Sequence, residues 1–87
     1  MDILQEVMIW KRLSEAVAVR YWCLHDLQTD QYAVQSADYF RLPFDEKQFS
    51  YFEKQFVELF VEVPARERCD WFDSLREAIH AHDQEFS

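Results

Sequence analysis

Four phenylalanines in the second half of the chain are spaced to line one face of an α-helix. Phe49, Phe52, Phe56 and Phe60 stand three, four and four residues apart, which matches the helical repeat and not the two-residue repeat of a strand. Phenylalanine binds no proton, metal or phosphate, so this face indicates packing and names no chemistry. We therefore expect the second half of the protein to be built around these four rings, the aromatic seam.

Size and composition predict a single globular domain over residues 1–87. The chain is close to the lower limit of what folds without disulfides or metals, and 49% of its residues are apolar and 17% aromatic, far more than a disordered chain carries. A core this small has little room for so many rings. Some rings should therefore reach the surface, where contiguous aromatic patches usually mark a protein partner or a second copy of the chain.

The first half of the chain predicts one helix followed by a β-hairpin. Asp2 and Gln5 have the spacing of a helix cap and its reciprocal partner. The apolar stripe behind this cap is formed by Ile3, Val7, Trp10 and Leu13. From Ala16 onward the residues become β-branched and aromatic and alternate between two faces, so residues 16–37 predict an antiparallel hairpin.

The absence of glycine from the chain limits its turns and its chemistry. Tight two-residue hairpin turns normally use glycine at positive φ, so we expect the turns to be made by Asp26, Thr29, Asp30 and Asp38. The glycine-rich loops that hold phosphates in P-loop and dinucleotide-binding proteins are excluded.

A second helix is predicted after Leu42-Pro43. Asp45 has the character of its N-cap, Gln48 takes the third helical position, and Phe44 is placed to pack on Phe49 as a hydrophobic staple. This helix is expected to carry the aromatic seam and to end at Val63. Residues 57–63 also alternate with period two, so a third strand there is the alternative.

Pro64 is expected to break the chain and to open a last helix as its first residue. The apolar face of that helix would be formed by Trp71, Leu75, Ile79 and Phe86, with Phe72 close to it. The predicted fold class is therefore α+β, a small single domain in the order α–β–β–α–α, with the hairpin covered by helices.

The charge balance disfavours nucleic acid as a direct ligand. The chain has seventeen Asp and Glu residues and nine Lys and Arg residues, which gives a formal net charge of −8. Binding to a phosphate backbone needs a basic patch. An acidic body favours basic protein surfaces and is repelled by anionic membranes. No apolar stretch approaches the length of a membrane span.

The cysteine content and the start of the chain predict a cytoplasmic protein. Two cysteines, Cys23 and Cys69, are too few for the disulfide scaffold of a secreted chain of this size. The first residues carry acid where a signal peptide carries base, so no export is expected.

Metal binding and nucleophilic catalysis have weak support in the sequence. A zinc site would need Cys23, His25 and Cys69 to converge with His80 or His82, and the short paired ligand spacings of zinc sites are missing. Two Cys/His/Asp sets can be written, Cys69 with His80 and Asp83, and Cys23 with His25 and Asp26. Both are weak, because a thiolate is activated by geometry and local field, and eleven residues separate Cys69 from His80, about three turns of a helix. We expect no catalytic residue, no metal and no cofactor.

Acidic residues in the second half form a row of one sign along the predicted helices. They are Glu58 and Glu62 on one helix and Glu67, Asp70, Asp73 and Glu77 on the next. Like charges at this spacing destabilise a helix slightly, so the row is either a solvated face relieved by Arg66, Arg68 and Arg76 or a surface presented to a basic partner.

Two classes of function follow from these observations. The first is a small acidic, non-enzymatic protein-binding module of the inhibitor, immunity or antitoxin type, which docks a basic protein through the acidic row with Trp71, Tyr51 and Trp22 as aromatic anchors. Bacterial nuclease immunity proteins are similar in size and acidity, although no motif of theirs occurs here. The alternative is a homodimer, or a pocket for an apolar ligand, built from the surplus of aromatic residues. Polar groups for such a pocket would come from Tyr21, Tyr32, Tyr39 and His25.

Overall fold

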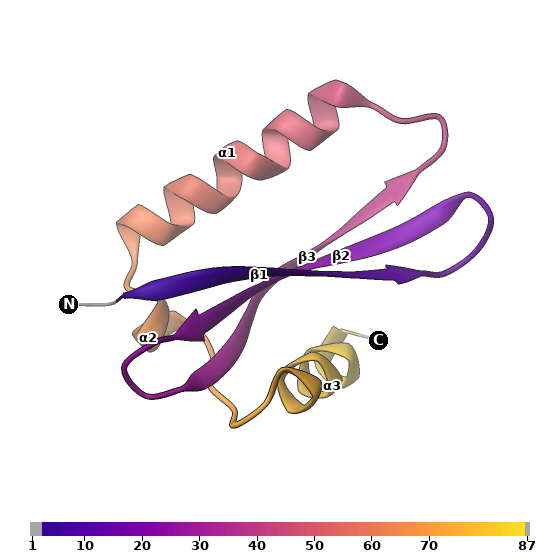
Figure 1. The fold of residues 1–87 in the computed structure, drawn as a ribbon. Helices are drawn as coiled ribbons and strands as arrows, with labels where there is room; N and C mark the ends of the chain where they lie inside the picture. Colours follow the sequence, from indigo (N-terminus) through magenta and orange to yellow (C-terminus); the bar gives the residue numbers. More distant parts are fainter. Residues whose placement is uncertain (1–2, 87) are drawn as a thin grey trace.

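The protein is a three-stranded antiparallel sheet followed by three helices. A computed structural model describes residues 3–86, in the order β1 (Leu4–Arg12), β2 (Val17–Asp26), β3 (Gln31–Arg41), α1 (Glu46–Glu62), α2 (Ala65–Arg68) and α3 (Leu75–Phe86) (Figure 1). The predicted α+β class is confirmed. The predicted order α–β–β–α–α is wrong at its start, because the first segment is a strand and not a helix. The single last helix of the prediction is divided into two helices in the structure.

The segment predicted as the first helix is the edge strand β1. It pairs antiparallel with β2, from Leu4 opposite Asp26 to Arg12 opposite Ala18. Residues 7–9 are all half-buried, so apolar side chains occupy both faces of the strand, and their spacing imitates a helical stripe. Asp2, the predicted cap, lies outside the described residues.

The hairpin predicted over residues 16–37 is present and longer than expected, because β3 continues to Arg41. Its turn is held by Asp26, whose carboxylate accepts hydrogen bonds from the N–H groups of Gln28 at 2.9 Å and Thr29 at 3.3 Å. Asp30 takes a positive φ of 59°, a conformation that short polar side chains tolerate better than most others. Asp38 does not form a turn, since it lies inside β3 opposite Arg20.

Helix α1 begins as the sequence predicts. The Asp45 side chain accepts hydrogen bonds from the N–H groups of Lys47 and Gln48, and the ring centroids of Phe44 and Phe49 lie 6.0 Å apart. The helix continues to Glu62, so the alternative of a strand over residues 57–63 is wrong.

The predicted last helix is divided into α2 and α3. Pro64 precedes α2, which ends after about one turn. The chain then meets the edge of β3, where Phe72 and Tyr32 exchange two backbone hydrogen bonds of 2.8 and 2.7 Å. Helix α3 begins only at Leu75. Six residues thus separate the two helices, because the backbone of this segment pairs with the sheet.

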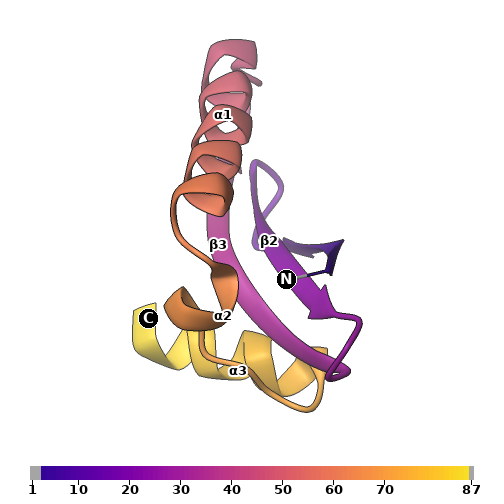
Figure 2. The ribbon, with the colours of Figure 1, turned by 90° about the vertical axis from the view of Figure 1, so that its left-hand side faces the viewer.

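Alternate residues of the central strand β2 build two cores, one on each face of the sheet. Trp22 and Leu24 pack with Phe56 of α1 and Ala65 of α2. The opposite face carries Val19, Tyr21 and Cys23, which pack with Leu75 and Ile79 of α3. Figures 1 and 2 show α1 and α3 on opposite sides of the sheet.

The aromatic seam is used inside the molecule. Phe56 is 7% exposed, and its ring stacks on that of Trp22 with the centroids 3.7 Å apart. Phe49 and Phe52 both contact the ring of Phe40 in β3. Only Phe60, near the end of α1, has a substantially exposed ring, so the seam attaches α1 to its own sheet.

Candidate functional site

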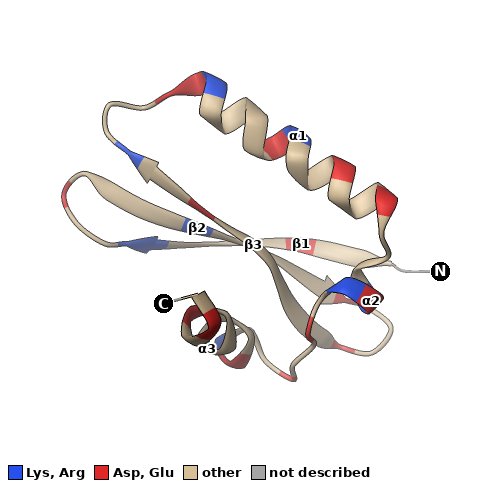
Figure 3. Cartoon of the chain, turned by 180° about the vertical axis from the view of Figure 1, so that it is seen from behind, with Lys and Arg blue, Asp and Glu red and all other residues tan. Residues whose placement is uncertain are grey.

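The six acidic residues of the predicted row are distributed over three helices and one connecting segment instead of the two predicted helices. All of them are exposed. In chain order they are Glu58 and Glu62 on α1, Glu67 on α2, Asp70 and Asp73 in the connecting segment, and Glu77 on α3. Figure 3 shows acidic positions continuing from α1 through α2 to α3. We call this set the acidic arc.

The two arginines of α2 point away from the acidic arc and toward the sheet. Arg66 lies 3.4 Å from a carboxylate oxygen of Asp26, donates a 3.1 Å hydrogen bond to Gln31, and places its guanidinium 4.4 Å from the ring of Trp71. Arg68 donates a 2.9 Å hydrogen bond to Gln35. These two arginines therefore bind residues outside the acidic arc.

Most carboxylates of the arc have no cation beside them. Within residues 3–86, the one ion pair that includes an arc residue joins Glu58 to Lys54 at 3.7 Å, and both side chains are exposed. The other five carboxylates lie on the surface without an ion-pair partner among the described residues. A basic partner would meet them unneutralised.

The three predicted aromatic anchors have different surroundings. Tyr51 is 60% exposed on α1, Trp71 is half-buried beneath Arg66, and Trp22 is 3% exposed in the core. Tyr51 and Trp71 are accessible to a partner, whereas Trp22 in this structure is a core residue.

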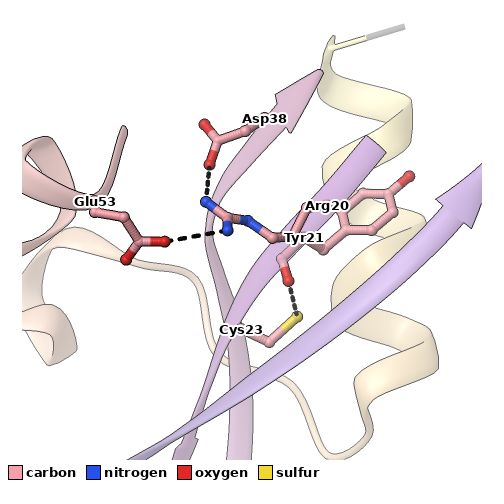
Figure 4. A network of polar contacts seen from close by, with 5 residues as sticks. All are labelled: Arg20, Tyr21, Cys23, Asp38 and Glu53. Atoms are coloured by element: carbon pink, nitrogen blue, oxygen red, sulfur yellow. Dashed lines mark hydrogen bonds and ion pairs between the residues drawn. The ribbon is translucent and has the colours of Figure 1, made fainter. Parts of the chain in front are cut away.

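Arg20, which no sequence motif marks, is the polar centre of the sheet face beneath α1. It is 3% exposed, and its guanidinium lies 3.3 Å from Asp38 in β3 and 3.2 Å from Glu53 in α1 (Figure 4). The signal in the sequence is a charged residue at an inward strand position, between Ala18 and Trp22.

Aromatic rings enclose the same guanidinium. Its central carbon lies 5.0 to 5.8 Å from the ring centroids of four residues, Trp10, Trp22, Phe40 and Phe49. Cation–π attraction adds to the two ion pairs. Burial raises the pKa of the Asp38 carboxyl, although Arg20 acts to lower it. A guanidinium neutralised on two sides is part of the framework that ties α1 to the sheet and is not available to bind an anionic ligand.

The two cysteines lie in different cores, and burial raises the pKa of both thiols. Cys23 is fully buried on the α3 face, where burial raises its pKa to about 11. Cys69 packs against the core on the α1 face, and burial raises its pKa as well. The zinc set containing both cysteines is therefore not brought together. In residues 3–86 no group of three His, Cys, Asp or Glu side chains is arranged to hold a metal ion.

The polar members of the two nucleophile sets have other partners. Asp83 accepts a 2.7 Å hydrogen bond from the Tyr21 hydroxyl, whose pKa is raised to about 12 by burial and by this contact. The His25 ring lies 2.6 Å from Asp30 and stacks on Tyr32. Asp26 holds the hairpin turn. Neither Cys/His/Asp set forms a nucleophile–base contact in the described residues.

A pocket of about 460 Å³ lies between β3, the α2–α3 connection and α3. Its lining includes Tyr39, Cys69, Phe72, His82 and Phe86. Of the four residues predicted to line a pocket, Tyr39 is here, and Tyr21 joins it in a smaller cavity of about 210 Å³. Tyr32 and His25 line neither cavity.

Comparison with protein-family models, curated proteins and solved structures gives no match for this chain. Among the described residues no helix has both the length and the apolar character needed to cross a membrane.

Proposed function

We propose that this protein is a small non-enzymatic binding module that docks a basic protein through the acidic arc. The observation that carries the proposal is the exposure of five carboxylates without ion-pair partners among residues 3–86, while the two arginines of α2 bind Asp26, Gln31 and Gln35. An acidic surface of this kind accelerates encounter with a basic surface and selects against acidic ones.

The proposed partner carries a basic, anion-binding surface. A row of carboxylates offers a basic surface the same negative charge as a row of phosphates, so a nucleic-acid-binding protein is a suitable chemical class of target. The module would act on it as an inhibitor or antitoxin does. Tyr51 and Trp71 provide accessible aromatic area beside the charges, and such residues often supply most of the binding energy in an interface.

Affinity capture with charge-matched variants tests the proposal. The arc variant combines Glu67→Gln, Asp70→Asn and Glu77→Gln. The control combines Glu15→Gln, Glu46→Gln and Glu85→Gln, which removes the same charge from exposed positions outside the arc. From nuclease-treated lysate of the source cells, the wild type and the control should retain a basic protein that modest salt releases, and the arc variant should not. Equal capture by both variants would contradict the proposal.

The pocket between β3 and α3 supports a second candidate, the binding of an apolar ligand. Its volume and the rings of Tyr39, Phe72 and Phe86 suit a small ligand, and Arg68, Asp70 and Glu85 add charged groups to the lining. Filling it with Ala81→Trp should abolish the binding of an uncharged apolar fluorescent probe such as Nile red while leaving capture of a basic partner unchanged. Unchanged probe binding in that variant would exclude this pocket.

A further inference from the structure

Strand β1 has an open edge along its whole length. In the part of the chain that the structure describes, the sheet order is β1–β2–β3, so β1 has a strand neighbour on one side only. The opposite edge of the sheet is paired at one point, where the backbone of Phe72 exchanges hydrogen bonds of 2.7 and 2.8 Å with Tyr32 of β3. Within residues 3–86, no backbone hydrogen bond from another segment reaches the outer edge of β1.

The register of β1 shows which backbone groups face outward. Backbone hydrogen bonds from Leu27 to Ile3 at 3.2 Å and from Leu13 to Val17 at 2.9 Å place the odd-numbered residues of this segment with their N–H and C=O groups toward β2. In an antiparallel ladder the residues between them direct the same groups to the other side. The outward set is Leu4, Glu6, Met8, Trp10 and Arg12.

The side chains at this edge are incompletely buried. Trp10 is 57% exposed, and Met8 is half-buried. Glu6 and Arg12 are both exposed, have opposite charge, and have no ion-pair partner among residues 3–86. Exposed edges with unpaired backbone groups favour pairing with another strand.

The charges of β1 are complementary to those of a second copy in one register. When a twofold axis perpendicular to the sheet relates the two copies, corresponding faces of the two β1 strands lie on the same side of the combined sheet. Each residue of β1 is then opposite a residue of the same face in the second copy. With Ile9 opposite Ile9 of the second copy, Glu6 lies opposite Arg12 twice, and Met8 lies opposite Trp10 twice. Centring the axis on Met8 instead places Glu6 opposite Trp10 and leaves both charges without a partner.

We infer that two copies of this chain pair through β1 in the register centred on Ile9, forming a continuous six-stranded antiparallel sheet. The dimer satisfies the outward backbone groups, covers Trp10, and makes two Glu6–Arg12 ion pairs across the new strand pair. This inference concerns the sheet edge and is independent of the acidic arc. Charged residues at an edge also serve to prevent pairing, and that role predicts a wild type that stays monomeric.

Charge reversal with restoration tests the inference in sedimentation equilibrium. The wild type should dimerise. Glu6→Arg and Arg12→Glu should each weaken dimerisation by about tenfold or more, because like charges then lie opposite each other twice. The double variant Glu6→Arg/Arg12→Glu should restore the wild-type association. Glu85→Arg, an exposed reversal on α3, is the control and should leave it unchanged.

Four results would overturn the inference. They are a wild type that stays monomeric at several hundred micromolar, a double variant no better than the single ones, single reversals no more harmful than the Glu85→Arg control, and single reversals that strengthen association. Far-ultraviolet circular dichroism confirms that each variant is folded.

Cysteine cross-linking tests the register itself. Ile9 would face its own copy as a non-hydrogen-bonded pair, with Cα atoms about 4.5 Å apart, within the range that a disulfide spans. Ile9→Cys should therefore give a disulfide-linked dimer on mild oxidation. Val7→Cys is the matched control, because Val7 would lie opposite Lys11 and not opposite itself. Equal cross-linking of the two variants, or none in either, would contradict this register.

Discussion

At the scale of single residues, Arg20 shows how the chain uses a charge inside a small core. The guanidinium replaces its lost hydration with Asp38, Glu53 and four aromatic rings. The two carboxylates differ in exposure, since the Asp38 side chain is 12% exposed and that of Glu53 is 40% exposed. Asp38 is therefore the partner that depends most on Arg20.

Replacing the arginine should reveal this dependence. Arg20→Met keeps the volume but leaves Asp38 buried without a cation, and it should lower the free energy of unfolding by about 3–5 kcal/mol. The double variant Arg20→Met/Asp38→Leu should recover part of that loss, because the buried carboxylate is then gone and the remaining one, Glu53, is exposed enough to be hydrated. Glu53→Gln, at a more exposed position, should cost less than about 1 kcal/mol. Urea denaturation measures all three, and a double variant less stable than Arg20→Met would contradict this explanation.

The thiols should be unreactive at neutral pH. Thiolates are the reactive form, and burial raises the pKa of Cys23 to about 11 and also raises that of Cys69. In the folded protein, Cys23 should react with iodoacetamide far more slowly than it does in denaturant, and Cys69, which is only partly buried, should react first. Mass spectrometry of the alkylated peptides at pH 7 and pH 9 separates the two. Rapid native labelling of Cys23 would show that its core opens readily.

At the scale of elements, the aromatic seam holds α1 on the sheet. Phe56→Ala removes the ring that stacks on Trp22 and should lower the free energy of unfolding by about 3–5 kcal/mol. Tyr51→Ala, on the exposed side of the same helix, should change stability by less than about 0.5 kcal/mol. Thermal or urea unfolding of the two variants makes the comparison, and similar losses in both would mean that the seam does not carry the attachment of α1.

Elements whose signals are local could be predicted from the sequence. Asp45, Gln48 and the Phe44–Phe49 pair all lie within one turn of the start of α1, so capping and packing at that point depend on neighbours in the chain. The hairpin could be predicted for the same reason, because the alternation of Val19, Tyr21 and Cys23 with their neighbours is a pattern of adjacent residues.

Elements decided by distant partners could not be predicted. Residues 4–12 carry a pattern compatible with a helix, and pairing with β2 makes them a strand. The stretch after Arg68 carries helical spacing, and its backbone bonds to Tyr32, forty residues away from Phe72 in the sequence, interrupt the helix. The same limit applies to the candidate site. The residue types of the acidic arc could be read from the sequence, but the direction of Arg66 and Arg68 depends on Asp26, Gln31 and Gln35.

At the scale of the whole molecule, the acidic arc and the open edge of β1 lie on different elements. The arc lies on the helices and their connections, whereas the open strand edge belongs to the sheet. A dimer joined through β1 would carry two acidic arcs, and two linked sites bind a repeated basic target more tightly than one site does.

The most direct test of the docking function is the affinity of the captured basic protein for the wild type, the arc variant and the charge-matched control, measured by titration calorimetry over a series of salt concentrations. We expect the affinity of the wild type and the control to fall as salt rises, and the arc variant to bind at least about tenfold more weakly at low salt with a smaller dependence on salt. If affinity does not change with salt, or if the control loses as much as the arc variant, the acidic arc is a solvated surface and not the docking site.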